Sequence, residues 1–146
     1  QGDGKVGAML TQADLQMMAM TGSSATGRKI MEACASGLKR LVLELGGKDP
    51  MIVFADADLK LAAQDAVTFS VTNCGQVCCA VERVYVEKSV KAEFEALCAE
   101  TAKTYTAGPG MEEGSKIGPM VSAMQRDLVK AQVDSAIEGG VKLLAQ

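Results

Sequence analysis

The sequence has no histidine and no tryptophan, and aromatic residues make up only 3% of its 146 residues. Without histidine, the chain alone cannot assemble a Ser-His-Asp or Cys-His catalytic set, or a zinc site that uses imidazole. Any proton transfer must therefore use a carboxylate, a lysine, a tyrosine, a thiol or water. The scarcity of aromatic rings also argues against a platform for stacking nucleic-acid bases.

Positive charge and long apolar runs are scarce as well. Lys and Arg number 15 against 18 Asp and Glu, which gives a net charge of −3 and an isoelectric point near 5.0. We therefore expect no nucleic acid as a partner, because no surplus of cations can neutralise its phosphates. No apolar run approaches the roughly 18 residues of a membrane span, so no membrane segment is expected. Apolar residues nevertheless make up 48% of the chain, which excludes a disordered protein.

The five cysteines form neither a disulfide pattern nor a metal-binding pattern. Their number is odd, and their spacing gives no CxxC pair. Three of them crowd together at Cys74, Cys78 and Cys79. We therefore expect free thiols in a reducing intracellular compartment, the cytosol or an organelle interior, and not a secreted protein.

Strand and helix patterns alternate along the chain, which predicts an α/β fold with parallel strands. Helices are expected over residues 4–12, from Ser23 or Ser24 to about Ala35, and over residues 58–71, 89–105 and 121–138. Strands are expected over residues 15–20, 39–44, 51–54 and 81–87, with a further strand starting at 141–144. An irregular segment over 72–80 carries the cysteine cluster, and glycine and proline indicate a loop over 106–118.

Two glycine-rich segments are candidates for binding phosphate. Residues 2–7, GDGKVG, have the spacing of a dinucleotide fingerprint but lack the preceding strand that the motif requires. Residues 22–29, GSSATGRK, lie between a predicted strand and a predicted helix, where free amide groups favour a phosphate. Capping of the helix by Ser23 and Ser24 is an equally good explanation. A P-loop is not expected, because Gly27 is not followed by lysine and a hydroxyl residue.

Two further segments carry groups that could react. Glu44 ends a strong predicted strand, and parallel sheets place their active sites at that edge, although a surface charge would fit as well. The segment 73–80, NCGQVCCA, holds thiols in a glycine-containing loop, where amide groups could lower a thiol pKa and stabilise an oxyanion. Buried, inert thiols are the alternative. The loop pattern alone does not distinguish Cys78 from Cys79.

Together, these segments resemble the aldehyde dehydrogenase superfamily. Residues 41–59, LVLELGGKDPMIVFADADL, are similar to its glutamate motif, and residues 73–87, NCGQVCCAVERVYVE, to its cysteine motif. Residues 20–30, MTGSSATGRKI, resemble its cofactor segment, and residues 112–129, EEGSKIGPMVSAMQRDLV, a later stretch. The resemblance implies a parallel-sheet α/β fold. Residues 1–45 would be the end of a Rossmann-like cofactor domain and residues 46–146 the start of an α/β catalytic domain.

The resemblance also implies residue roles. Cys78 would be the nucleophile and Glu44 the general base. The cofactor, NAD or NADP, would lie against six further residues. Those near its pyrophosphate are Gly22, Ser23 and Gly27; those beside the nicotinamide, through their backbones, are Leu45 and Gly46; the one near a ribose is Gln125.

The implied activity is the oxidation of a small aldehyde to a carboxylic acid by NAD(P)⁺, through a thiohemiacetal and a thioester on the cysteine. The resemblance implies a central fragment, inactive alone, of an enzyme that is a homo-oligomer at full length. Two alternatives stay open. One is a cysteine-based redox protein, in which Cys74 or Cys79 would resolve a sulfenic acid on Cys78 without any nucleotide. The other is a catalytically silent structural subunit, against which an intact Cys78 and Glu44 both count.

Overall fold

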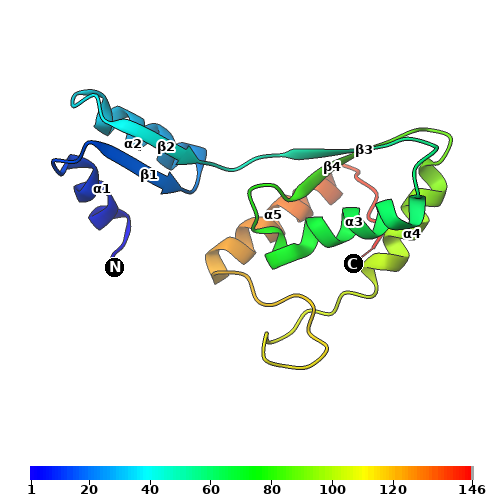
Figure 1. The fold of residues 1–146 in the computed structure, drawn as a ribbon. Helices are drawn as coiled ribbons and strands as arrows, with labels where there is room; N and C mark the ends of the chain where they lie inside the picture. The colour runs from blue at the N-terminus through cyan, green and yellow to red at the C-terminus, as the bar shows by residue number, and fades with distance from the viewer. Residues whose placement is uncertain (146) are drawn as a thin grey trace. The chain divides into compact units, whose positions relative to one another are not determined.

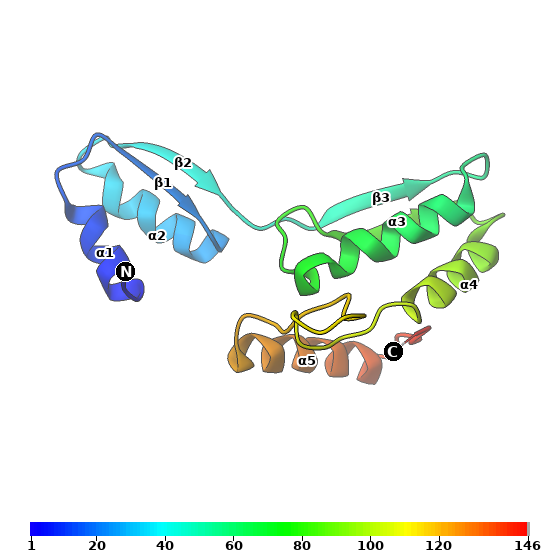
Figure 2. The same ribbon diagram turned by 60° about the horizontal axis from the view of Figure 1, so that its bottom comes forward.

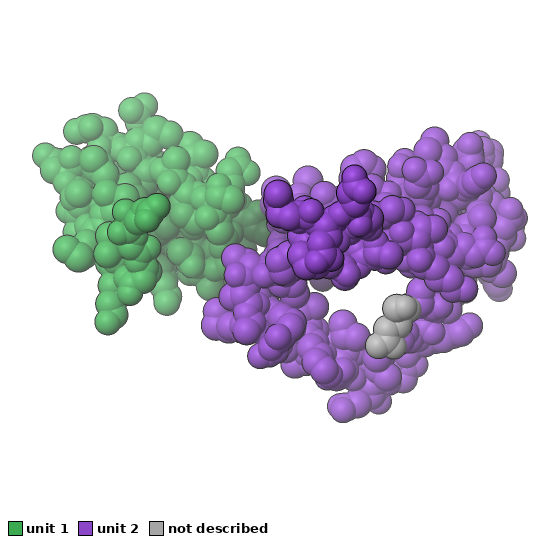
Figure 3. All heavy atoms as spheres, turned by 90° about the horizontal axis from the view of Figure 1, so that it is seen from below, with its two compact units in different colours: residues 1–47 green, residues 48–146 purple. Residues whose placement is uncertain are grey.

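A computed structural model describes residues 1–145, which form two compact units (Figure 3). The first unit runs from Gln1 to Gly47, and the second begins at Lys48. The domain boundary after residue 45 that the resemblance implies stays a prediction. Each unit has its own pair of parallel strands and its own apolar core.

The first unit is a strand–helix–strand unit preceded by one helix (Figure 1). Its elements are α1 (Gly4–Gln12), β1 (Met17–Thr21), α2 (Ser24–Ala35) and β2 (Arg40–Glu44). The two strands pair in parallel, from Met17 opposite Arg40 to Thr21 opposite Glu44. Because parallel strands need a crossover connection, α2 carries the chain back along the sheet.

Helix α2 packs on the β1–β2 sheet through a small apolar core. Its buried members are Met18 on β1 with Ile30 and Cys34, which lie one turn apart on α2. Partly buried side chains surround them, namely Leu15, Met20, Leu41 and Leu43. The parallel order brings the N-terminus of α2 and the C-terminus of β2 to the same edge of the sheet, where such folds bind ligands.

The second unit starts with β3 (Asp49–Val53), α3 (Leu59–Val71) and a short 3₁₀ turn, Thr72–Gly75. The elements that follow are β4 (Val81–Val86), α4 (Lys91–Ala102) and α5 (Ala123–Glu138). Strands β3 and β4 pair in parallel, with a register shift between Asp49 and Pro50. The shift occurs beside a proline, which has no N–H for the strand ladder.

Helix α3 contacts both the β3–β4 sheet and α4 (Figure 2). The buried core there consists of Val53, Ala63, Ala66 and Phe94. The two alanines lie on the buried face of α3, and their small side chains leave room for the Phe94 ring of α4. No side chain of α5 is buried, and the helix starts after a cap at Ser122, whose hydroxyl accepts from the Gln125 N–H at 3.2 Å.

All the expected helices and four of the five expected strands are confirmed, with some ends shifted by a few residues. Strand β3 begins at Asp49 and not at Met51. The prediction started at Met51 because the apolar pattern begins only after Pro50. Helix α4 is shorter than expected, from Lys91 to Ala102. The prediction of a strand over residues 141–144 is wrong, because no strand forms there among the residues described. A strand is held by hydrogen bonds to a neighbour, and no described strand pairs with this segment.

Candidate active site

The N-terminus of α2 offers amide groups at the ligand-binding edge of the β1–β2 sheet. Ser23 caps the helix: its hydroxyl accepts from the Thr26 N–H at 3.1 Å, and its carbonyl accepts from the Gly27 N–H at 2.9 Å. The N–H groups of Ser24 and Ala25 therefore remain at the helix end for an anion. Ser23 is exposed, as a phosphate site at this position requires.

Glu44 lies at the end of β2, directly beside this helix end. Its carbonyl accepts from the Gly22 N–H at 2.9 Å, which joins the first residue after β1 to the last residue of β2. The Glu44 side chain is exposed. Among residues 1–145 its carboxylate has no hydrogen-bond or ion-pair partner, so it is available as a base.

Gly27 allows the residue after Glu44 to pack against α2. A Cβ atom on Gly27 would lie 3.0 Å from Cδ2 and 3.2 Å from Cδ1 of Leu45. Gly27 is buried, and Leu45 is half-buried. Glycine at this position therefore lets the Leu45 side chain approach the helix backbone, which links α2 directly to the Glu44–Gly46 segment.

An apolar cavity of about 390 Å³ lies between α1, β1 and α2. Residues from all three elements line it, among them Gly4, Gly7, Met18, Met20, Thr26 and Ile30. A Cβ atom on Gly4 or Gly7 would meet nothing within 4 Å, so both glycines border open space. Thr26 lies in the first turn of α2, so the cavity adjoins the helix end that offers free amides. An apolar slot beside amide donors is what a dinucleotide needs for its base and its pyrophosphate.

The cysteine segment has an unusual backbone. Asn73, Cys74 and Gly75 have φ angles of 52°, 58° and 71°, so three consecutive residues adopt the left-handed conformation. Glycine adopts it most readily and asparagine less so, and a Cβ atom on Gly75 would lie 3.0 Å from the Ser70 carbonyl oxygen. The sequence predicts an irregular segment here, but nothing in its residue types predicts three consecutive left-handed residues.

Cys78 and Cys79 are both exposed at the end of this segment. The N–H of Ala80, which is buried, donates to the Val77 carbonyl at 3.1 Å and closes a turn around the two thiols. The other cysteines are less accessible: Cys74 and Cys98 are half-buried, and Cys34 is only 1% exposed. Burial, together with the nearby Glu95 carboxylate, raises the pKa of the Cys98 thiol. All five thiols are free.

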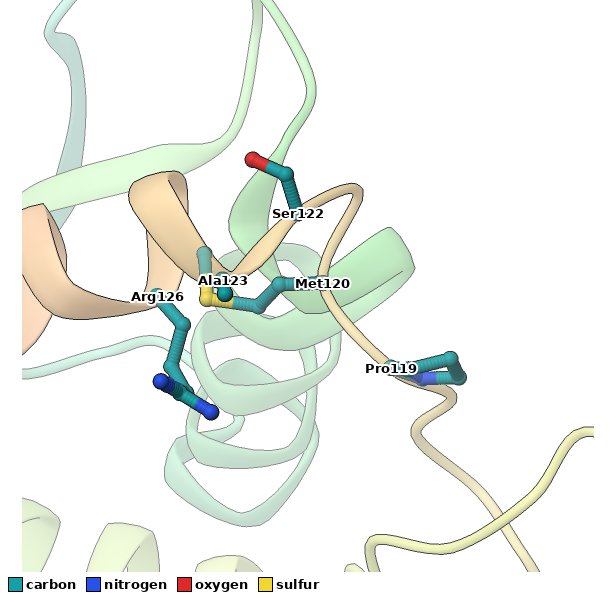
Figure 4. Close-up of a pocket in the computed structure, with 5 residues that line it drawn as sticks. All are labelled: Pro119, Met120, Ser122, Ala123 and Arg126. Carbon is teal, nitrogen blue, oxygen red and sulfur yellow. The ribbon is translucent and has the colours of Figure 1, made fainter.

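A shallow pocket of about 260 Å³ lies at the start of α5 (Figure 4). Its polar side chains, Ser122 and Arg126, point in different directions, and the Ser122 hydroxyl already caps the helix. Arg126 forms an ion pair with Asp127 at 2.7 Å. Its polar groups do not converge, so this pocket lacks the arrangement of a specific ligand site.

The family of the chain follows from comparison with known proteins. The model of the aldehyde dehydrogenase family matches residues 1–146. The chain belongs to the aldehyde dehydrogenase family. The α/β fold with parallel strands that the sequence predicts is confirmed, because solved aldehyde dehydrogenases superpose closely on it.

Three solved aldehyde dehydrogenases illustrate the similarity. Aldehyde dehydrogenase C from Pseudomonas syringae, a variant solved with NAD⁺ and octanal, is 36% identical with a TM-score of 0.94, over 99% of this chain and 30% of that one. The enzyme from Bartonella henselae is 38% identical with a TM-score of 0.93, over the same shares. Betaine aldehyde dehydrogenase from Staphylococcus aureus, solved with NAD⁺, is 33% identical with a TM-score of 0.90, over 95% and 28%. The chain thus spans about 30% of the length of these relatives.

In this aldehyde dehydrogenase chain, most predicted site residues come together within one unit. The first unit gathers them around the start of α2 and the end of β2, namely Gly22, Ser23, Gly27, Glu44, Leu45 and Gly46. The second unit holds Cys78 and Gln125; the latter lies in the first turn of α5. The apolar cavity was not predicted from the sequence. The glycine spacing over residues 2–7 was the signal that could have indicated it, because Gly4 and Gly7 line the cavity. Within residues 1–145, no cluster of metal-ligating side chains occurs, and no helix has the length and apolar character to cross a membrane.

Proposed function

We propose that the chain is the central part of an NAD(P)⁺-dependent aldehyde dehydrogenase, with Cys78 as nucleophile and Glu44 as general base. The observation that carries the proposal is the exposed Cys78 thiol, held in a turn of the cysteine segment, in a chain that matches the family throughout. Solved relatives hold NAD⁺, and one of them holds octanal, which supports an aldehyde as the substrate.

Cys78 would act first, as a thiolate that attacks the aldehyde carbon. The new carbon–sulfur bond gives a thiohemiacetal, whose oxygen needs hydrogen-bond donors while it carries negative charge. Backbone N–H groups of the turn around Cys78 are the donors that this chain can contribute. The bound cofactor supplies a hydride acceptor, so that the thiohemiacetal becomes a thioester.

Glu44 would act second, on the water that releases the product. Its exposed carboxylate can take a proton from that water, whose oxygen then attacks the thioester carbon. The carbon–sulfur bond breaks, the acid leaves, and Cys78 is regenerated as a thiolate. No histidine occurs in the chain, so a carboxylate in this role agrees with the composition.

The residues around α2 would hold the cofactor. The free amides of Ser24 and Ala25, with the Ser23 hydroxyl, suit a pyrophosphate, and Gly22 and Gly27 flank them. The cavity between α1, β1 and α2 suits the adenine ring, because it is apolar and adjoins that helix end. Leu45 and Gly46 would lie beside the nicotinamide, and Gln125 near a ribose.

The wider assignments are also proposals. The unit that ends at Gly47 would be the end of the cofactor-binding domain, and the unit from Lys48 the start of the catalytic domain. The full-length enzyme would form a homo-oligomer. The five free thiols support a reducing intracellular compartment.

The test uses the full-length enzyme with substitutions at the two reacting residues. Cys78→Ala should abolish NAD(P)H formation, whereas Cys79→Ala, its neighbouring control, should retain most of the turnover. Glu44→Gln should reduce steady-state turnover by about 100-fold or more, yet leave a stoichiometric burst of NAD(P)H, because hydrolysis becomes limiting. Turnover by Cys78→Ala would refute the nucleophile, and normal turnover by Glu44→Gln would refute the base.

Nucleotide binding separates this proposal from the redox alternative. A cysteine-based redox protein would not need the α2 site, so it should bind NAD⁺ weakly or not at all. Isothermal titration of the full-length protein with NAD⁺ and NADP⁺ decides this point and also identifies the preferred cofactor. A silent structural subunit would bind nucleotide but show no burst.

A further inference from the structure

Both the oxygen and the nitrogen of the Gln76 side-chain amide form hydrogen bonds. Its Oε1 accepts from the backbone N–H of Val121 at 3.1 Å, and its Nε2 donates to the carbonyl of Asn73 at 2.9 Å. Gln76 lies two residues before Cys78. One side chain therefore connects the cysteine segment to the segment that precedes α5.

The cysteine segment depends on such contacts because its backbone is strained. Asn73 and Cys74 are non-glycine residues with positive φ, a conformation that persists only where neighbouring contacts enforce it. Besides the Gln76 contact, the Asn73 Nδ2 donates to the Gln76 carbonyl at 3.2 Å, and the Gln76 N–H donates to the Asn73 carbonyl at 3.1 Å. These hydrogen bonds close the left-handed turn upon itself.

A second contact joins the same two segments. The Cys74 thiol donates to the Gly118 carbonyl at 2.9 Å, three residues before the Val121 N–H that Gln76 binds. The left-handed turn is thus fixed to the 118–121 segment at two points. The turn that carries Cys78 follows directly and ends at buried Ala80.

We infer that Gln76 is a positioning residue for the Cys78 nucleophile, and that it acts by holding the cysteine segment against the 118–121 segment. The inference rests on the proposed function, since it assumes that Cys78 reacts. Gln76 suits this role because its amide both donates and accepts. Methionine, of similar length, cannot donate and is only a weak acceptor, and a glutamate carboxylate can only accept.

The experiment is a double-mutant cycle in the full-length enzyme. Gln76→Met removes both side-chain hydrogen bonds, and Val121→Pro removes the N–H that Gln76 binds. Each should lower kcat about tenfold or more with KM changed less than about twofold, because misplacement of a reacting group impairs the chemical step. The double variant should lose about as much as either single variant, not the product of both losses.

Two controls keep the result interpretable. Gln132→Met makes the same substitution on α5, where Gln132 is exposed and makes no side-chain hydrogen bond within residues 1–145, and should leave kcat unchanged. Gln76→Glu keeps the acceptor for Val121 and should lose less kcat than Gln76→Met. If Gln76→Met does not fold, Gln76→Ala, which also removes both side-chain hydrogen bonds, replaces it in the cycle. Melting temperatures are measured for all variants.

Two results would overturn the inference: wild-type kcat in Gln76→Met, or multiplicative losses in the double variant. The first result, if it came with a lower melting temperature, would assign Gln76 a purely structural role. Failure of the underlying function is distinguishable, since turnover by Cys78→Ala would refute the nucleophile whatever the Gln76 variants do.

Discussion

At the scale of single residues, the cysteines differ chiefly in access. Cys34 is only 1% exposed and Cys98 is half-buried with a raised thiol pKa, whereas Cys78 and Cys79 are exposed. The thiolate is the form that reacts with alkylating reagents. Exposure therefore leaves Cys78 and Cys79 as candidates for the nucleophile. An experiment on their reactivity must distinguish the two.

We predict that iodoacetamide labels Cys78 first in the native full-length enzyme, and that NAD⁺ changes this rate. Cys98 should label slowly at pH 7.5, because burial and Glu95 keep its thiol protonated. Its rate should continue to rise with pH beyond the point where an ordinary thiol is fully ionised. Peptide mapping by mass spectrometry over a pH series measures both effects, and initial labelling at Cys34 or Cys98 would contradict the prediction.

Gly27 and Gly7 predict different effects of the same substitution. Gly27→Ala should be about 1–3 kcal/mol less favourable than Gly7→Ala, because the new Cβ would lie 3.0 Å from Cδ2 of Leu45, whose side chain must shift to make room. Gly7→Ala should stabilise the fold by about 0.5–1 kcal/mol, since alanine favours the α1 helix and meets nothing within 4 Å. Urea unfolding of both full-length variants tests the pair, and equal effects would show that the Leu45 contact does not matter.

At the scale of elements, the helix caps separate a structural role from a binding role. Ser23→Ala removes the cap of α2, and Asp58→Ala removes the cap of α3, where the Asp58 carboxylate accepts from the Leu61 N–H at 3.0 Å. Each should cost about 1 kcal/mol of stability.

Only Ser23→Ala should also weaken NAD⁺ binding, because only α2 is expected to face the pyrophosphate. Titration calorimetry on both full-length variants, beside their unfolding curves, provides the comparison. Equal affinities in the two variants would remove Ser23 from the cofactor site and leave it as a helix cap alone.

The sequence predicts the elements well where local chemistry decides them. The Ser23–Ser24 pair indicates the start of α2 through capping, and the apolar runs of β1 and β2 indicate strands. It fails where long-range contacts decide. The strand over residues 141–144 needs a neighbour that no local pattern reveals, and the left-handed run at Asn73–Gly75 depends on contacts with distant residues.

The same division applies to the candidate site. Glu44 and the start of α2 were predictable, because parallel strands bring their C-terminal ends to one edge. The contact of Gln76 with Val121 was not, since it joins residues 45 positions apart in the chain. The resemblance to a family identifies candidate reacting residues, whereas only the three-dimensional structure shows which residues form hydrogen bonds around them.

At the scale of the whole molecule, each unit has a sheet of two strands within residues 1–145. A two-stranded sheet is marginal alone, and its open edges can pair with other chains. Large apolar side chains are also exposed on the second unit, among them Ile52 on β3 at 64% and Phe69 on α3 at 55%. Large apolar side chains that would otherwise contact water normally pack against another part of the protein or against a partner.

We therefore predict that residues 1–146 expressed alone do not oxidise aldehydes and associate with themselves. The chain spans about 30% of the length of solved aldehyde dehydrogenases, and an enzyme's ligand site is normally an enclosed pocket that buries most of the ligand. Light scattering should show association, and NAD⁺ reduction with a simple aliphatic aldehyde should stay at background, whereas the full-length enzyme is active under the same conditions. A monodisperse 146-residue protein with the turnover of a normal dehydrogenase would prove the prediction wrong, because two-stranded sheets and exposed apolar faces would then suffice for the complete active site.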